Sequence, residues 1–334
     1  CGRRQGQGST ARRPGGILRL MALAPDDTGE AVRQLQRRLG AAGFLPESGV
    51  TPDVYCAGTR QAVADFQRDR GLSITGICDE GTWSALIEAW WNLGDRPLML
   101  RSPNLRGDDV EELQRLLSRL GFDVGRIDGI FGAIAARAVR YFQENAGLEI
   151  DGVCTADTVA VLRRLSKMTG DGPGIAAVRD AEQARLGESL AGRRVAVGHF
   201  GDVAEVVAAL SDALRDHGAM LLDVGDDEPA QQGSTANLFG ADVYVGVEEA
   251  EPGQSRVAYY SVPAFESTGG RALAHLVERH LRDVVPRLTV QGMRLPILRE
   301  TKMPAVLLTL GPNTAGRHQR IAEGVFLALL AWAP

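Results

Sequence analysis

The histidines and one acidic stretch are the side chains that could hold a metal ion. The sequence contains five histidines and a Glu-rich stretch at 248–251, but no H-E-x-x-H motif. His275 and His280 lie five residues apart, so they do not share a helical face as an i,i+4 pair would. His217 lies beside an expected helix end, where a cation is electrostatically favourable. These patterns predict structural or exposed histidines and a solvated acidic loop.

The composition is that of a folded chain with several domains. Hydrophobic residues make up 44% of the 334 positions and charged residues 24%, proportions that allow sizeable cores. At about 150 residues per domain, the length predicts two or three domains. The formal net charge of −5 argues against nucleic-acid binding, which usually needs a clustered basic excess. No stretch approaches the roughly 20 apolar residues of a membrane-spanning helix, so no transmembrane segment is expected.

Residues 1–25 are predicted to form a basic, flexible tail. The segment is rich in Arg and Gly and has no apolar signal-peptide core. Three interpretations stay open: a truncated reading frame whose true start lies near Met21, a disordered basic tail, or a mature lipoprotein that begins at an acylated Cys1.

The first half of the chain contains one unit twice. Matching segments occur in the same order in both copies: 30–39 with 109–117, 40–44 with 120–122, 62–67 with 138–143, and 75–78 with 151–154. The shared order indicates a duplication. Each copy predicts three short helices, because apolar residues such as Val32, Leu35 and Leu39 recur at helical spacing. We place repeat 1 at 26–95 and repeat 2 at 100–167.

The cysteines follow the duplication. Cys78 and Cys154 occupy equivalent positions, which predicts one shared packing role. Cys56 has no obvious partner. Unpaired thiols are typical of a reducing compartment, so we expect a cytoplasmic location, with the cell envelope or the extracellular space as the alternative.

The repeated pattern resembles the peptidoglycan-binding domain type 1 family. The sequence motifs of that family are, in chain order, L-Q-x-x-L, G-(F/Y), D-G-x-F-G, A-V-x-x-F-Q and G-L-x-x-D-G. Repeat 2 follows this order almost throughout, whereas repeat 1 departs at 53–56 and has Thr75 in place of the last Asp. The resemblance implies binding of cell-wall glycopeptide, with repeat 2 as the better candidate. The implied ligand-binding residues are Asp128, Gly129, Phe131, Gly132, Tyr141 and Gln143.

Two tryptophans, Trp90 and Trp91, close repeat 1. We expect them to pack one repeat against the other. Stacking on a sugar ring is the alternative.

The second half changes character after a Gly-rich stretch at 168–189 that reads as a linker. Apolar runs and helical patterns then alternate through 190–334. Strands are expected at 194–198, 219–224, 241–247, 256–260 and 304–310, and helices at 205–214, 272–284 and 321–332. The sequence thus predicts a multidomain fold: two small all-α three-helix repeats, followed by an α/β domain with a mostly parallel sheet flanked by helices.

Several phrases of this second half resemble the zinc-dependent N-acetylmuramoyl-L-alanine amidase family (amidase type 3). The run 304–311 follows the family's P-A-V-L-(V/I)-E-(L/I)-G, 321–325 follows I-A-x-G-I, and 241–247 follows A-D-L-x-I-S-(I/L)-H. The resemblance covers 190–332. It implies a zinc ion on two His and one Glu, with a further Glu as general base or acid.

Most of the implied catalytic positions hold other residues. Glu248 stands where the second zinc His is expected, and Thr309 stands at the catalytic Glu. His199 follows the first strand in a shortened loop, and Glu205 is a possible match for the zinc Glu. We therefore expect no catalytic residue and no cofactor, with His199, Glu205 and Glu248 as the remaining metal candidates.

Both resemblances predict a peptidoglycan-binding, catalytically degenerate amidase-like protein that regulates or scaffolds cell-wall peptidoglycan metabolism. Non-catalytic regulators of this layout occur in actinobacteria. The resemblance implies peptidoglycan or muropeptides, and a protein of cell-wall precursor synthesis, as partners. Two alternatives stay open: an active zinc amidase with rearranged metal ligands, and a lipoprotein adaptor anchored at Cys1.

Overall fold

The computed structural model describes residues 22–46, 48–167, 189–225, 228–249, 255–262, 265–311 and 316–332. The expected N-terminal tail lies almost wholly outside the described residues, as does the expected linker. None of the helices in the described part of the chain is both long enough and apolar enough to cross a membrane.

Each repeat is a three-helix unit, as the sequence predicts. Repeat 1 has α1 (Glu30–Ala41), α2 (Ala57–Asp69) and α3 (Glu80–Glu88), and repeat 2 has α4 (Asp108–Arg119), α5 (Ala133–Ala146) and α6 (Ala156–Ser166). The duplicated phenylalanines make the same edge-on contact in both cores. Phe44 meets Phe66 at 5.4 Å, and Phe122 meets Phe142 at 5.7 Å.

The second half is an α/β domain. Its elements are β1 (Arg194–Phe200), α8 (Ala204–Asp216), β2 (Met220–Gly225), α9 (Pro229–Phe239), β3 (Val243–Glu249), β4 (Arg256–Val262), β5 (Phe265–Glu266), α10 (Thr268–Leu281), β6 (Thr289–Met293), α11 (Pro296–Glu300), β7 (Ala305–Leu310) and α12 (His318–Trp332). The strand order is β2-β1-β3-β7-β4-β5, and β6 pairs with β4. Among the described strands, four pairs are parallel, while β4 runs antiparallel to β7 and β5. The sheet is therefore mixed and mostly parallel.

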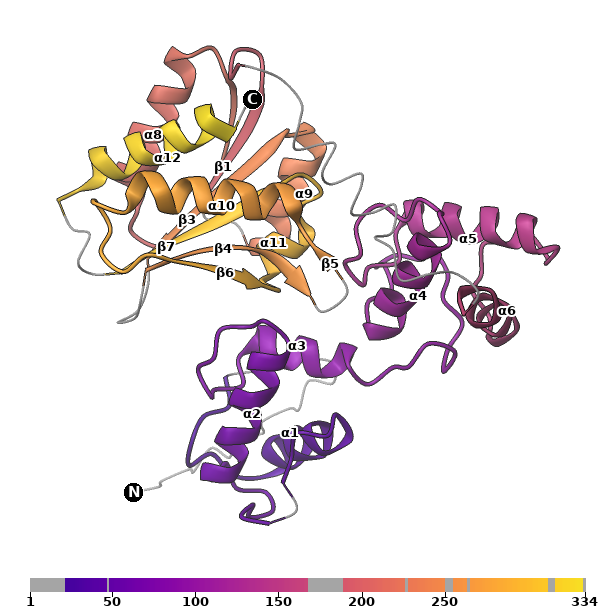
Figure 1. Ribbon diagram of the computed structural model, residues 1–334. Coiled ribbons are helices and arrows are strands. Elements are labelled where there is room, and N and C mark those ends of the chain that lie inside the picture. Colours follow the sequence, from indigo (N-terminus) through magenta and orange to yellow (C-terminus); the bar gives the residue numbers. More distant parts are fainter. Residues whose placement is uncertain are drawn as a thin grey trace, which may run out of the picture.

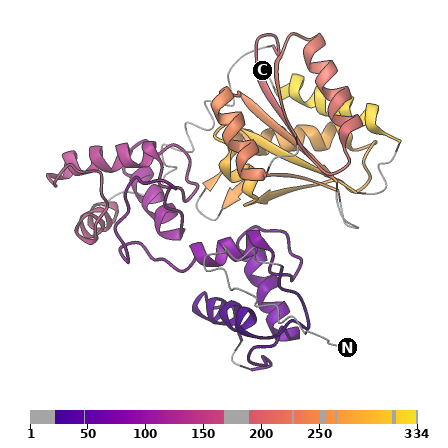
Figure 2. The same ribbon diagram turned by 180° about the vertical axis from the view of Figure 1, so that it is seen from behind.

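The helices cover the two faces of this sheet unequally. α8, α10 and α12 pack together over one face, as Figure 1 shows. The other face has α9 and the short α11, and there the hydrophobic core continues from the sheet into repeat 2. Figure 2 shows both repeats beside the α/β domain from behind. Repeat 2 and the α/β domain thus share one core, whereas repeat 1 has its own.

Candidate functional site

The amidase resemblance would place zinc at the carboxyl ends of β3 and β7. This end of the sheet holds a different cluster. Glu248 in β3 and Thr309 in β7 are register partners, and Thr309 also lies opposite Arg256 in β4. The Thr309 hydroxyl donates to Glu248 Oε1 at 2.6 Å, and Arg256 Nη2 lies 3.6 Å from the same carboxylate oxygen. Arg256 also reaches repeat 1, where it donates to Ser73 Oγ at 3.4 Å. Glu248 is therefore held by a hydroxyl and a guanidinium.

The other two metal candidates are engaged elsewhere. His199 Nε2 lies 3.9 Å from Asp223 Oδ1 on the neighbouring strand, and Glu205 pairs with His318 at the start of α12. Among the described residues, no three His, Cys, Asp or Glu side chains are grouped so that they could hold a metal ion. The residues present do not fit the two His and one Glu that such a zinc ion needs.

The D-G-x-F-G turn of repeat 2 is built around a buried glutamine. Gln114 accepts hydrogen bonds from the Asp128 and Gly129 N–H groups and donates to Asp128 Oδ1. The Asp128 carboxylate also accepts from the Ile130 N–H at 2.9 Å. Burial raises the pKa of Asp128, and these hydrogen bonds act against that rise. Gln36, in the equivalent position of repeat 1, binds the turn at 51–54 in the same way.

The predicted ligand residues do not form one surface. Phe131 is fully buried in the core, and Gln143 is 2% exposed and binds the turn at 151–153. Gly129 is buried, with φ near 70°, and a Cβ there would lie only 3.0 Å from the Gly107 carbonyl oxygen. Tyr141 is 54% exposed on α5. Asp128 and Gly132 do line a cleft.

That cleft lies between repeat 2 and the α/β domain and has a volume of about 520 Å³. Repeat 2 contributes the D-G-x-F-G turn and the start of α5, and the α/β domain contributes α9 and the end of α11. Its polar lining includes Arg106, which pairs with Glu300 across the boundary. Lys302 is exposed at the rim, and Ile134 and Leu238 add apolar surface. Convergent charges, amides and apolar side chains of this kind suit a peptide-like ligand.

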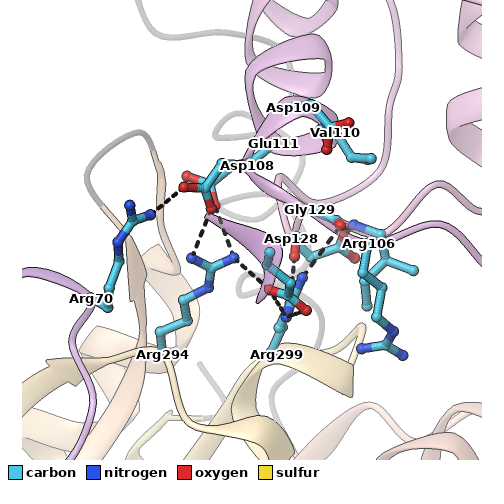
Figure 3. A network of polar contacts seen from close by, with 12 residues as sticks. Arg70, Arg106, Asp108, Asp109, Val110, Glu111, Asp128, Gly129, Arg294 and Arg299 are labelled. Atoms are coloured by element: carbon cyan, nitrogen blue, oxygen red, sulfur yellow. Dashed lines mark hydrogen bonds and ion pairs between the residues drawn. The ribbon is translucent and has the colours of Figure 1, made fainter. Parts of the chain in front are cut away.

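Two buried arginines of the α/β domain hold the repeats in place around this cleft (Figure 3). Arg299 binds both carboxylate oxygens of Glu88 at 2.8 and 2.7 Å and donates to the Asp128 carbonyl oxygen at 2.6 Å. Arg294 lies 3.3 Å from Glu88 and 3.4 Å from Glu111. Since Glu88 ends α3 of repeat 1 and Glu111 lies in α4 of repeat 2, the α/β domain binds both repeats at one point.

Further contacts close the same boundary. The backbone N–H of Arg294 donates a hydrogen bond to the Gly71 carbonyl oxygen at 2.8 Å. The Arg126 guanidinium lies 4.5 Å from the centre of the Tyr260 ring and donates to the Leu298 carbonyl oxygen. Sequence reasoning missed these arginines. The one available signal is the stretch 294–299, where two arginines flank Leu295, Ile297 and Leu298.

The family match and the relative that spans most of the chain agree with this architecture. The peptidoglycan binding domain family matches residues 28–86 and 106–162. The chain is 31% identical over 363 aligned positions to the N-acetylmuramoyl-L-alanine amidase CwlM of Mycobacterium tuberculosis, covering 92% of this chain and 88% of that protein. It is 34% identical over 161 positions to the amidase CwlL of Bacillus licheniformis, covering 42% of this chain and 44% of that one. Among solved structures, the amidase AmiC2 of Nostoc punctiforme matches with 20% identity and a TM-score of 0.36, over 42% of this chain and 98% of that chain.

Proposed function

We propose that this chain, which belongs to the N-acetylmuramoyl-L-alanine amidase family, binds peptidoglycan, no longer cleaves it, and regulates or scaffolds cell-wall metabolism. The two peptidoglycan-binding repeats and the amidase-like domain relate it to cell-wall amidases. The loss of catalysis and the regulatory role are the proposal.

The observation on which the proposal rests is the Thr309–Glu248–Arg256 cluster. A catalytic carboxylate must be free to exchange a proton with water or substrate. Thr309, at the family's catalytic position, instead donates a hydrogen bond to Glu248. Arg256 balances the charge of Glu248. Glu248 is thus engaged by a hydroxyl and a guanidinium, which supports a structural role for this end of the sheet.

The cleft beside Asp128 supports binding of a muropeptide. A stem peptide presents amides and carboxylates, and the cleft offers the exposed ammonium of Lys302, with Arg106 beside it in its pair with Glu300. Binding at a domain boundary would also let a ligand influence how repeat 2 meets the α/β domain. A protein of precursor synthesis as partner, and a cytoplasmic location supported by the free thiols of Cys56, Cys78 and Cys154, belong to the same proposal.

Two assays with the full chain test the proposal. Purified peptidoglycan incubated with the protein and zinc should release no peptide with a free L-alanine amino terminus. Muropeptides should bind, and Lys302→Ala should weaken that binding about fivefold, since one charge-assisted contact contributes about 1 kcal/mol. Lys167→Ala removes an exposed charge outside the cleft and is the matched control. Chelator-sensitive peptide release would instead establish the zinc amidase. If the protein binds neither intact peptidoglycan sacculi nor muropeptides, peptidoglycan binding is overturned.

A further inference from the structure

Repeat 1 has a small cavity of its own next to an exposed tryptophan. The cavity, about 250 Å³, lies between the ends of α1 and α3 and is lined only by residues of repeat 1, among them Arg38, Leu86, Trp90 and Asn92. Trp90 is 48% exposed. Part of the indole surface is therefore open to solvent beside the cavity.

Arg38 is placed against both indole rings of this region. Its guanidinium carbon lies 5.5 Å from the ring centre of Trp90 and 5.8 Å from that of Trp83, within the range of cation–π attraction. Its Nε is buried and has no hydrogen-bond partner among the described residues. No ion pair to Arg38 is recorded within the described residues either, so its charge is available to an anion.

The duplication provides an internal comparison for these three positions. The residues of repeat 2 that correspond to Arg38, Trp83 and Trp90 are Leu116, Val159 and Ser166. All three are buried, with exposures of 6%, 4% and 6%. The three-helix unit therefore folds with small, enclosed side chains there. Repeat 1 instead has a cation and two indoles together at these positions, which points to a role other than folding.

We propose that this cavity is a glycan site, in which a sugar ring stacks on Trp90 and a carboxylate on that sugar pairs with Arg38. The inference rests on the proposed function, because it assumes that the ligand is cell-wall material. The apolar face of a hexosamine ring suits an indole, and the guanidinium suits a carboxylate. Muramic acid presents its lactyl carboxylate only after the stem peptide has been removed, so the site selects peptide-free glycan. The cleft beside repeat 2 is then left for the peptide.

The test compares two soluble glycans by calorimetry and tryptophan fluorescence with the full chain. One is the peptide-free glycan of amidase-treated peptidoglycan, and the other is chitotetraose, which is neutral. Trp90→Ala should weaken binding of both at least tenfold. Arg38→Gln should weaken binding of the carboxylated glycan about fivefold and leave chitotetraose unchanged. Ile150→Ala, which removes a similarly exposed apolar side chain from repeat 2, is the matched control and should change neither.

The outcomes separate this inference from the function on which it rests. If wild-type protein binds sacculi but Trp90→Ala binds peptide-free glycan as well as wild type does, the glycan site is wrong and the proposed function stands. If wild type binds muropeptides but neither glycan, the same conclusion holds. If wild type binds no sacculi at all, the proposed function fails first. Trp90→Leu provides a second variant should the alanine variant misfold.

Discussion

The carboxylate of Glu88 is one point at which the α/β domain binds repeat 1, and its removal should destabilise the unit formed by the α/β domain and repeat 2. Glu88 is 7% exposed and faces two arginines that are themselves 6% and 8% exposed, Arg294 and Arg299. Removing one partner of a buried ion pair costs about 3–5 kcal/mol, because the remaining charge stays buried without compensation. Arg299 keeps two carbonyl acceptors and Arg294 keeps Glu111, which favours the lower end of that range.

For Glu88→Gln we therefore expect a loss of about 3 kcal/mol in the free energy of unfolding, measured by urea denaturation at neutral pH. Repeat 2 and the α/β domain, which share one core, form a unit of about 200 residues that unfolds with an entropy of about 0.4 kcal/mol/K, so the midpoint of its thermal unfolding should fall by about 7 °C. The matched control is Glu112→Gln. Its carboxylate also pairs with an arginine, at 3.3 Å, but its side chain is 33% exposed, and such a pair contributes less than about 1 kcal/mol.

The reasoning is refuted if Glu88→Gln lies within 1 kcal/mol of wild type, or if it matches Glu112→Gln. Either result would mean that the guanidinium groups are solvated in solution and that the two repeats are not held by the α/β domain.

Three further expectations concern single side chains. Hydrogen bonds lower the pKa of the partly exposed Cys56 thiol to about 7, whereas burial raises that of Cys78 to about 12, so iodoacetamide at pH 7 should label Cys56 at least about 100-fold faster in mass-spectrometric mapping; equal rates would contradict this. Burial raises the pKa of Glu111 above its ordinary 4.5, so the folded chain holds a proton that the unfolded chain releases just above that pH. The free energy of unfolding should therefore fall as pH rises through this window, and Glu111→Gln should flatten that slope in urea titrations; an unchanged slope would refute the assignment. Phe131→Ala should cost about 3–5 kcal/mol of stability because Phe131 is fully buried, whereas the exposed Tyr141→Ala should cost under about 0.5 kcal/mol, and equal losses in calorimetry would argue against these placements.

The elements with strong periodicity could be predicted from the sequence. The three helices of each repeat follow from apolar residues at helical spacing, and β1, β3 and β7 from continuous apolar runs that suit strands buried on both faces. α9 was missed because residues 229–239 have Gln, Gly and Ser where an apolar stripe would be expected. α10 begins at Thr268, four residues before the expected start, because the Ser267 side chain caps it by accepting from the Gly270 N–H.

The candidate site was predicted only in part. The sequence pointed to the turn at Asp128, and the structure places that turn at a cleft. It did not reveal that Arg299 binds the carbonyl oxygens of the same turn, because residue type alone does not tell whether an arginine is exposed or buried between domains. The phrase D-G-x-F-G is explained largely by local geometry: Gly129 adopts a positive φ, and Gln114 holds the turn.

The core shared by repeat 2 and the α/β domain has a consequence for how the chain opens and closes. Regions that share a core tend to unfold together and to exchange their amide hydrogens with the same free energy. Amides of α4 and of β4, which are more than 130 residues apart in the sequence, should therefore exchange together, whereas the amides of α1, in the separate core of repeat 1, exchange on their own. Two copies that arose by duplication then belong to different folding units, so the boundaries of sequence homology and the boundaries of cooperative unfolding do not coincide.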